Sequence, residues 1–140
     1  MTRLIGLSTA SVLFVLSLLH VYWAAGGAWG SGVTIPKEDG KPLFEPPPAG
    51  TLLVASLLLS AALVVLGRLG VWGSGLPRWP LAAGIWTLVA VFVGRVVGDF
   101  KWFGVFKRMK GTAFAKWDNW LYVPLCLLLG LGCLVLALGV

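Results

Sequence analysis

Charged residues are scarce in this 140-residue chain: they make up 11% of it, whereas hydrophobic residues make up 59%. A soluble domain carries roughly 25% charged residues, so the composition excludes an ordinary soluble domain. The chain also lacks a phosphate-binding glycine loop and a nucleophile elbow. The basic residues that give the chain its net charge of +6 lie beside apolar runs. This position favours anionic lipid headgroups over nucleic acid as a partner.

Cysteine and histidine are almost absent. Cys126 and Cys133 lie seven residues apart in one apolar run. On a helix this spacing separates their Cα atoms by ~10 Å, which is too far for a disulfide. A single histidine and the lack of a Cys–His spacing argue against a structural metal site. We therefore expect no metal and no cofactor, and a packing role for both cysteines.

Long apolar runs are what the chain has in abundance. Four of them cover residues 4–23, 49–67, 81–97 and 121–140. Each is close to the ~20 residues with which a helix crosses a hydrocarbon core of roughly 30 Å. In lipid, a chain without the alternation of a β-barrel spans only as helices. The sequence therefore predicts an all-α, integral membrane four-helix bundle that forms a single domain over residues 1–140.

The middle of each run lacks Asp, Glu, Lys and Arg. Carriers coupled to ions or protons usually place such a residue near the bilayer midplane. Transport through the centre of the bundle is therefore disfavoured, and the ionisable residues of interest lie where the runs end.

The first and third loops differ in character. Residues 26–48 are rich in Gly and Pro, which disfavours regular structure. Residues 99–120 are aromatic and basic. Read as a helix, this third loop predicts an interfacial amphipathic segment before the fourth helix, with an apolar face made of Trp102, Val105, Phe106 and Met109. Its basic residues are expected to contact anionic lipid headgroups, and those nearest the third run are Lys101, Lys107, Arg108 and Lys110.

Basic residues are divided unevenly between the two ends of the runs. The first and third loops share one side and carry seven of them, whereas the other side carries Arg3, Arg68 and Arg78. Because positive residues favour the cytoplasmic side of a membrane, the count predicts that loops one and three are cytoplasmic.

Three ionisable residues gather at this loop-rich side. His20 lies about one turn before the end of the first run, and the i, i+4 spacing of Arg95 and Asp99 at the end of the third favours an ion pair. Ionisable residues at membrane depth are candidates for a functional site. His20 and Asp99 are the candidate catalytic residues, with His20 as a general acid/base. Candidate ligand-binding residues at the same level are Tyr22, Trp23, Trp29, Arg95, Lys101, Asp118 and Tyr122.

A structural interpretation of the same residues stays open. Arg95 is close enough to the membrane boundary to snorkel, and its pairing with Asp99 would then only anchor the helix end. His20 would hydrogen-bond Ser17 or a carbonyl and hold two helices together.

Several segments resemble a known family. Residues 20–30 read HVYWAAGGAWG, residues 98–101 read GDFK, residues 106–108 read FKR and residues 122–126 read YVPLC. Together they resemble small bacterial membrane proteins described as domain of unknown function 3995. The resemblance implies four spans and a bacterial cytoplasmic (inner) membrane, and it carries no activity or catalytic residue onto this chain.

Two functional hypotheses follow. The first is a membrane-embedded binding or acid/base catalytic site for a small amphiphilic or lipid-like molecule at one membrane face, with an apolar floor and a few polar groups at its mouth. The alternative is a non-enzymatic subunit that interacts with lipid or docks on a partner through the basic third loop. Four short helices enclose little volume, which leaves a homodimer open in either case.

Overall fold

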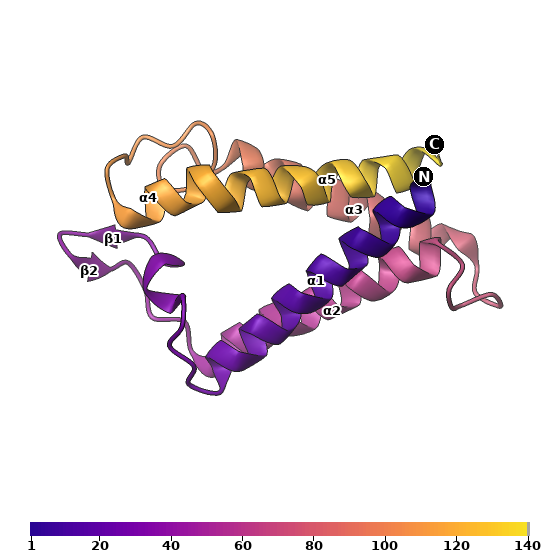
Figure 1. Cartoon of the computed structure of the whole chain (residues 1–140), viewed down its shortest axis with the longest axis horizontal. Coiled ribbons are helices and arrows are strands. Elements are labelled where there is room, and N and C mark those ends of the chain that lie inside the picture. The colour runs from indigo at the N-terminus through magenta and orange to yellow at the C-terminus, as the bar shows by residue number, and fades with distance from the viewer. Residues whose placement is uncertain (140) are drawn as a thin grey trace.

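The computed structural model describes residues 1–139, and within them four long helices account for most of the chain (Figure 1). The all-α class is therefore confirmed, and all four helices are long and apolar enough to cross a membrane. The helices are α1 (Thr2–Ala24), α2 (Pro48–Arg68), α3 (Arg78–Val97) and a fourth, continuous helix made of α4 (Ala113–Trp117), the π-helical segment η2 (Asp118–Tyr122) and α5 (Val123–Leu138).

Proline begins the second and third helices, and glycine ends the third. The second helix has Pro48 in its first turn, and α3 follows Pro77 directly. Proline suits the first helical turn because its missing N–H has no intrahelical partner there. At the other end of α3, Gly98 takes a φ of +87°, a conformation that residues with a Cβ rarely adopt. The boundary of the third span is therefore set by local chemistry.

The helices associate as two pairs. The first helix packs along α2 and α3 packs along α5, while α2 and α3 meet near the chain termini (Figure 1). The core there contains Leu13, Val65, Ile85 and Cys133, all fully buried. Toward the first and third loops the two pairs diverge. The bundle is therefore closed at the end that holds the termini and open at the end that holds the long loops.

The first loop contains short regular elements that its composition did not predict. A 3-10 turn, η1 (Ser31–Val33), precedes two antiparallel strands, β1 (Lys37–Glu38) and β2 (Lys41–Pro42), which pair Lys37 with Pro42. Asp39 and Gly40 between them both have positive φ, as a tight hairpin turn requires. The loop reaches across to the fourth helix, where the Tyr122 hydroxyl donates to the Val33 carbonyl at 3.2 Å.

The prediction of an amphipathic segment in the third loop is wrong. Residues 98–112 contain no helix, and the expected apolar face does not form: Trp102 is buried, whereas Val105 and Phe106 are exposed. The chain instead folds back on the end of α3, with the Val105 N–H bonded to the Val96 carbonyl at 2.8 Å. A Cβ on Gly104 would lie 2.6 Å from that same carbonyl oxygen, so glycine permits this close approach.

The fourth helix also begins earlier than predicted, at Ala113 instead of residue 121. The Thr112 hydroxyl accepts a hydrogen bond from the Ala115 N–H at 3.0 Å, which is a typical N-cap. The helix therefore carries Asp118 and Asn119 inside it, and they lie in its π-helical turn. Such turns are rare and are frequent at functional sites.

Candidate functional site

Asp118 is the centre of a buried polar cluster at the open end of the bundle. Its side chain is fully buried. One carboxylate oxygen, Oδ1, is 2.6 Å from Nη2 of Arg95, and the other, Oδ2, is 2.9 Å from Nζ of Lys107. The Gly104 N–H also donates to Oδ2, at 3.0 Å. A buried carboxylate needs such partners because burying it alone is very costly.

Lys107 also belongs to this cluster, which the sequence did not predict. It was expected to contact lipid headgroups, but its side chain is only 1% exposed. Its ammonium group donates to Asp118, to the Gly104 carbonyl at 2.9 Å and to Asn119 Oδ1. An ammonium group has three N–H donors, so Lys107 is satisfied inside the protein. Lys101, Arg108 and Lys110 remain exposed.

Arg95 has unused hydrogen-bonding capacity inside the cluster. Its side chain is 29% exposed and its guanidinium lies over the Phe103 ring, 4.8 Å from the centroid. The Nη1 atom is buried and has no hydrogen-bond partner within residues 1–139. Two cations and one carboxylate give the cluster a net charge of +1, so a further anion or oxygen-bearing group at Arg95 would be favoured.

The predicted pairing of Arg95 with Asp99 is wrong. The i, i+4 rule applies within one helix, but α3 ends at Val97. Asp99 Oδ1 instead accepts hydrogen bonds from the backbone N–H groups of the next turn, those of Lys101 at 3.0 Å, Trp102 at 2.7 Å and Phe103 at 2.9 Å. Burial acts to raise the pKa of Asp99, but these donors outweigh it and hold the pKa below its usual value.

His20 does not join the cluster either. It lies on α1, in the other helix pair, where Nδ1 is 2.8 Å from the Leu16 carbonyl oxygen. Its ring meets Trp23 edge-on at 5.0 Å. No hydrogen bond joins His20 to Arg95, Asp99 or Asp118 in the described part of the chain. The expected convergence of His20, Arg95 and Asp99 is therefore not found; Arg95 meets Asp118 instead.

The aromatic residues that follow His20 fold the start of the first loop. The Trp23 indole N–H donates to the Trp29 carbonyl at 2.8 Å, and the Trp29 N–H donates to the Tyr22 hydroxyl at 3.4 Å. The Tyr22 ring lies against Gly27, where a Cβ would collide with it. These contacts fix the turn that ends α1, and Trp29 remains mostly exposed.

An aromatic path connects the cluster to the first loop. Phe103, which lies under Arg95, contacts Phe114 edge-on at 5.4 Å, and Phe114 is 6.0 Å from Tyr122. Tyr122 then bonds to Val33. Tyr122, a predicted ligand-binding residue, is therefore brought close to Arg95 and Asp118, whereas Lys101 stays outside the cluster, exposed and over the Trp102 ring.

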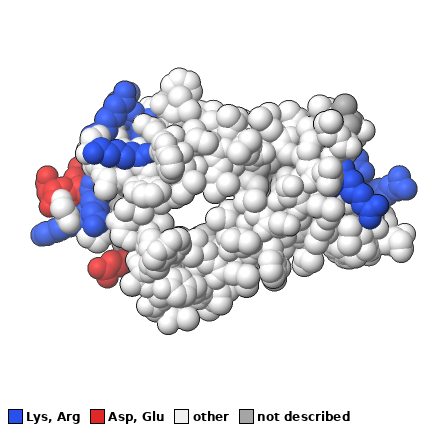
Figure 2. Space-filling model, in the orientation of Figure 1, with Lys and Arg blue, Asp and Glu red and all other residues white. Residues whose placement is uncertain are grey.

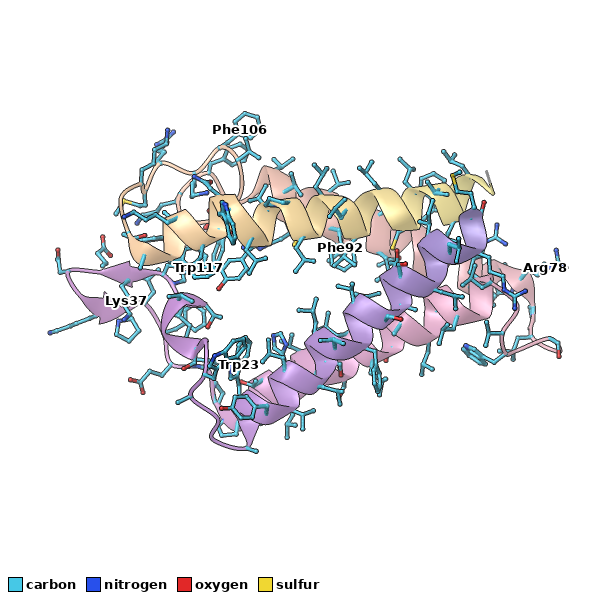
Figure 3. All side chains as sticks on the ribbon, viewed as in Figure 1. Trp23, Lys37, Arg78, Phe92, Phe106 and Trp117 are labelled. Atoms are coloured by element: carbon cyan, nitrogen blue, oxygen red, sulfur yellow. The ribbon has the colours of Figure 1, made fainter. Side chains whose placement is uncertain are left out.

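An apolar groove runs between α1 and α5. It has a volume of about 480 Å³ and is lined by Leu4, Ser8, Val12, Leu125 and Gly132, among others. A hollow also separates the two helix pairs toward the loops (Figure 2). Trp23 and Phe92 point toward this hollow from opposite sides (Figure 3).

One face of the fourth helix connects the groove to the polar cluster. Asp118 lies one π-helical turn before Tyr122, and Tyr122, Leu125, Leu129 and Gly132 then follow one another at spacings of three and four residues. This spacing keeps side chains on one side of a helix. The last three line the groove, so an apolar surface leads toward a polar end.

The fold and site define a class: a four-helix protein, apolar enough to cross a membrane, with a buried ion cluster at one end. The model of the family described as protein of unknown function (DUF3995) matches residues 13–133, and the chain belongs to that family. The match includes the whole ion cluster and His20. No curated protein and no solved structure matches the sequence.

Proposed function

We propose that this chain is a multi-pass protein of the bacterial inner membrane, with its first and third loops on the cytoplasmic side. The four apolar helices support insertion. The sidedness rests on the basic residues, most of which lie in these two loops. Lys107 lies inside the ion cluster, yet without it the loop side still has more basic residues than the other side.

Within that setting, we propose that the protein binds a small amphiphilic molecule with an anionic or oxygen-bearing headgroup. The observation that carries this proposal is the single helix face that leads from the apolar groove to Tyr122 and the Arg95–Asp118 pair. The apolar part of the ligand would occupy the groove between α1 and α5. Its headgroup would accept a hydrogen bond from the unpartnered Nη1 of Arg95.

The geometry favours binding over acid/base catalysis. A general base needs to lie within hydrogen-bonding reach of the proton that it removes. Asp99 Oδ1 is occupied by three backbone N–H groups, and His20 lies on the other helix pair, where no carboxylate of residues 1–139 is bonded to it. In the part of the chain that the structure describes, the two predicted catalytic residues are therefore not arranged so that one orients the other.

Exposed residues of the third loop favour a second, non-enzymatic role at the membrane surface. Lys101, Arg108 and Lys110 are exposed, and so are Val105 and Phe106. Basic and apolar side chains together are typical of segments that rest on anionic headgroups. This contact would hold the loop at the interface whether or not a ligand is bound.

The test of ligand binding is mass spectrometry of the small molecules that remain on the protein in mild detergent. We expect a defined amphiphile on the native chain, and at least about tenfold less of it on Arg95→Gln, since a hydrogen bond to a charged group is lost. Arg108→Gln removes the same charge from an exposed site and should retain the ligand.

The apolar half of the site has its own pair of variants. Ser8→Trp places a large ring in the groove and should displace the ligand, because Ser8 lines the groove and is exposed. Ser60→Trp makes the same change on an exposed position of α2 and should have no effect. If the native chain and the four variants all retain only bulk lipids, in equal amounts, the binding site is excluded. The contact of the third loop with the membrane surface would then be the remaining proposal.

A further inference from the structure

A second cavity lies at the opposite end of the molecule, away from the ion cluster. It has a volume of about 400 Å³ and sits between the end of α2, the start of α3 and the loop that joins them. Arg68 from α2, Arg78 from α3 and Ser74 from the loop supply polar groups, while Trp72 and Leu81 supply apolar surface. Figure 3 shows Arg78 at this far end. The volume lies in the range of roughly 300–1,000 Å³ that is typical of ligand sites.

The electrostatics of this cavity favour an anion. All five acidic residues of the chain lie in the first loop, the third loop or the fourth helix. In the view of Figure 2, this end shows blue side chains and no red ones. Neither arginine therefore has a carboxylate partner within residues 1–139, and Nε of Arg68 is buried without any hydrogen-bond partner.

The start of α3 adds to the positive potential. The first N–H groups of a helix have no intrahelical acceptor and form the positive end of its dipole. The first turn of α3 contains no acidic residue, and no side chain caps it. Arg78 is the first residue of this helix, so the helix end and one of the two arginines border the same cavity.

We propose that this cavity binds a phosphate-bearing anion, either a free phosphate or the headgroup of an anionic phospholipid. Guanidinium groups match phosphate oxygens with two parallel N–H donors, and here two of them line one small cavity. Exposed Trp72 and Trp79 lie at the same end, as aromatic residues do at the level of headgroups. The site is separate from the amphiphile site, and only its lipid source depends on membrane insertion.

The test has two arms that distinguish the sources. In the first, inorganic phosphate is titrated into the full chain in mild detergent and binding is followed by phosphorus NMR. In the second, the chain is reconstituted in vesicles of equal parts phosphatidylcholine and phosphatidylglycerol, and native mass spectrometry counts the phosphatidylglycerol that is retained. In whichever arm the native chain binds its anion, we expect Arg68→Gln and Arg78→Gln each to weaken that binding by about tenfold or more.

Arg3→Gln is the matched control. It removes the same charge from an exposed residue of α1 that does not line the cavity, and it should bind as the native chain does. Ser74→Glu places a carboxylate beside the arginines from an exposed loop position and should abolish binding without disturbing a helix. Equal binding by the native chain and Arg68→Gln in both arms would overturn the proposal, and so would an equal loss in Arg3→Gln.

Discussion

The two ends of the molecule carry the same net charge, but their charged side chains are arranged differently. The end with the long loops has eight basic and five acidic side chains, which leaves +3, and the other end has three arginines and no acidic residue, also +3. At the loop end, opposite charges meet in a buried cluster that fastens the third loop to the fourth helix. At the other end the positive charges lack counter-charges within the described chain (Figure 2).

The difference shows that net charge alone does not identify a binding site. Buried ion pairs are costly to desolvate, and removing one partner leaves the other charged group uncompensated. The loop end should therefore depend on its charges for folding. The opposite end should fold equally well without its positive charges. Their loss should be detected only when an anion is present.

The largest expected effect is that of Asp118→Asn. The change leaves Arg95 and Lys107 without their shared carboxylate, and we expect a loss of about 3–5 kcal/mol in the free energy of unfolding. Unfolding in detergent, followed by circular dichroism, measures it, and limited proteolysis should show cleavage within residues 98–112. Asp39→Asn is the control, because Asp39 is exposed in a turn. A loss below 1 kcal/mol would mean that the cluster does not hold the loop.

A smaller but substantial effect is expected at the glycine that ends α3. Gly98 has φ +87° and ψ −170°, a region that only glycine adopts readily, and a Cβ there would collide with the Phe103 carbonyl. We expect Gly98→Ala to reduce the free energy of unfolding by about 2 kcal/mol or more. Gly94→Ala, one turn earlier, meets open space and should be neutral or slightly stabilising.

The number of long apolar helices and the positions of the first three could be predicted from the sequence, because the length of an apolar run reports directly on a helix that is long enough to cross lipid. The grouping of Arg95, Asp118 and Tyr122 at one end also followed from the order of the helices along the chain. Their partners did not follow. Arg95 and Asp118 are 23 residues apart, and their meeting depends on how α3 packs on the fourth helix.

The third loop was mispredicted for a related reason. A helical reading of residues 99–112 assumes that the local backbone is free to be helical, whereas Gly98 and Gly104 adopt positive φ and reverse the chain. Lys107 was assigned to anionic lipid headgroups because it lies in a basic loop beside an apolar run. Its partner, Asp118, is 11 residues away in a π-helical turn, and residue periodicity does not report such a turn.

A modest, pH-dependent effect is expected for Asp99. Its pKa lies below the ordinary value of 3.8 in the folded protein, so the carboxylate contributes stability that is present above that value and is lost as the pH falls through the lower, folded pKa. Since Asp99 is exposed, we expect Asp99→Asn to cost less than about 1 kcal/mol at neutral pH. The unfolding free energy of the native chain should converge with that of the variant on acidification, and a constant gap between them would contradict this.

The smallest effect on stability is expected at the opposite end, for Arg68→Gln and Arg78→Gln. Because neither guanidinium has a carboxylate partner within residues 1–139, each change should alter the free energy of unfolding by no more than about 0.5 kcal/mol. Arg95→Gln removes one charge as well, but it breaks a 2.6 Å pair with buried Asp118 and should cost about 1.5–3 kcal/mol. Parallel unfolding of the three variants in phosphate-free detergent measures the contrast. A comparable loss in all three would mean that the arginines of the far end also act in folding, because charges held for an outside anion contribute stability only when that anion is bound.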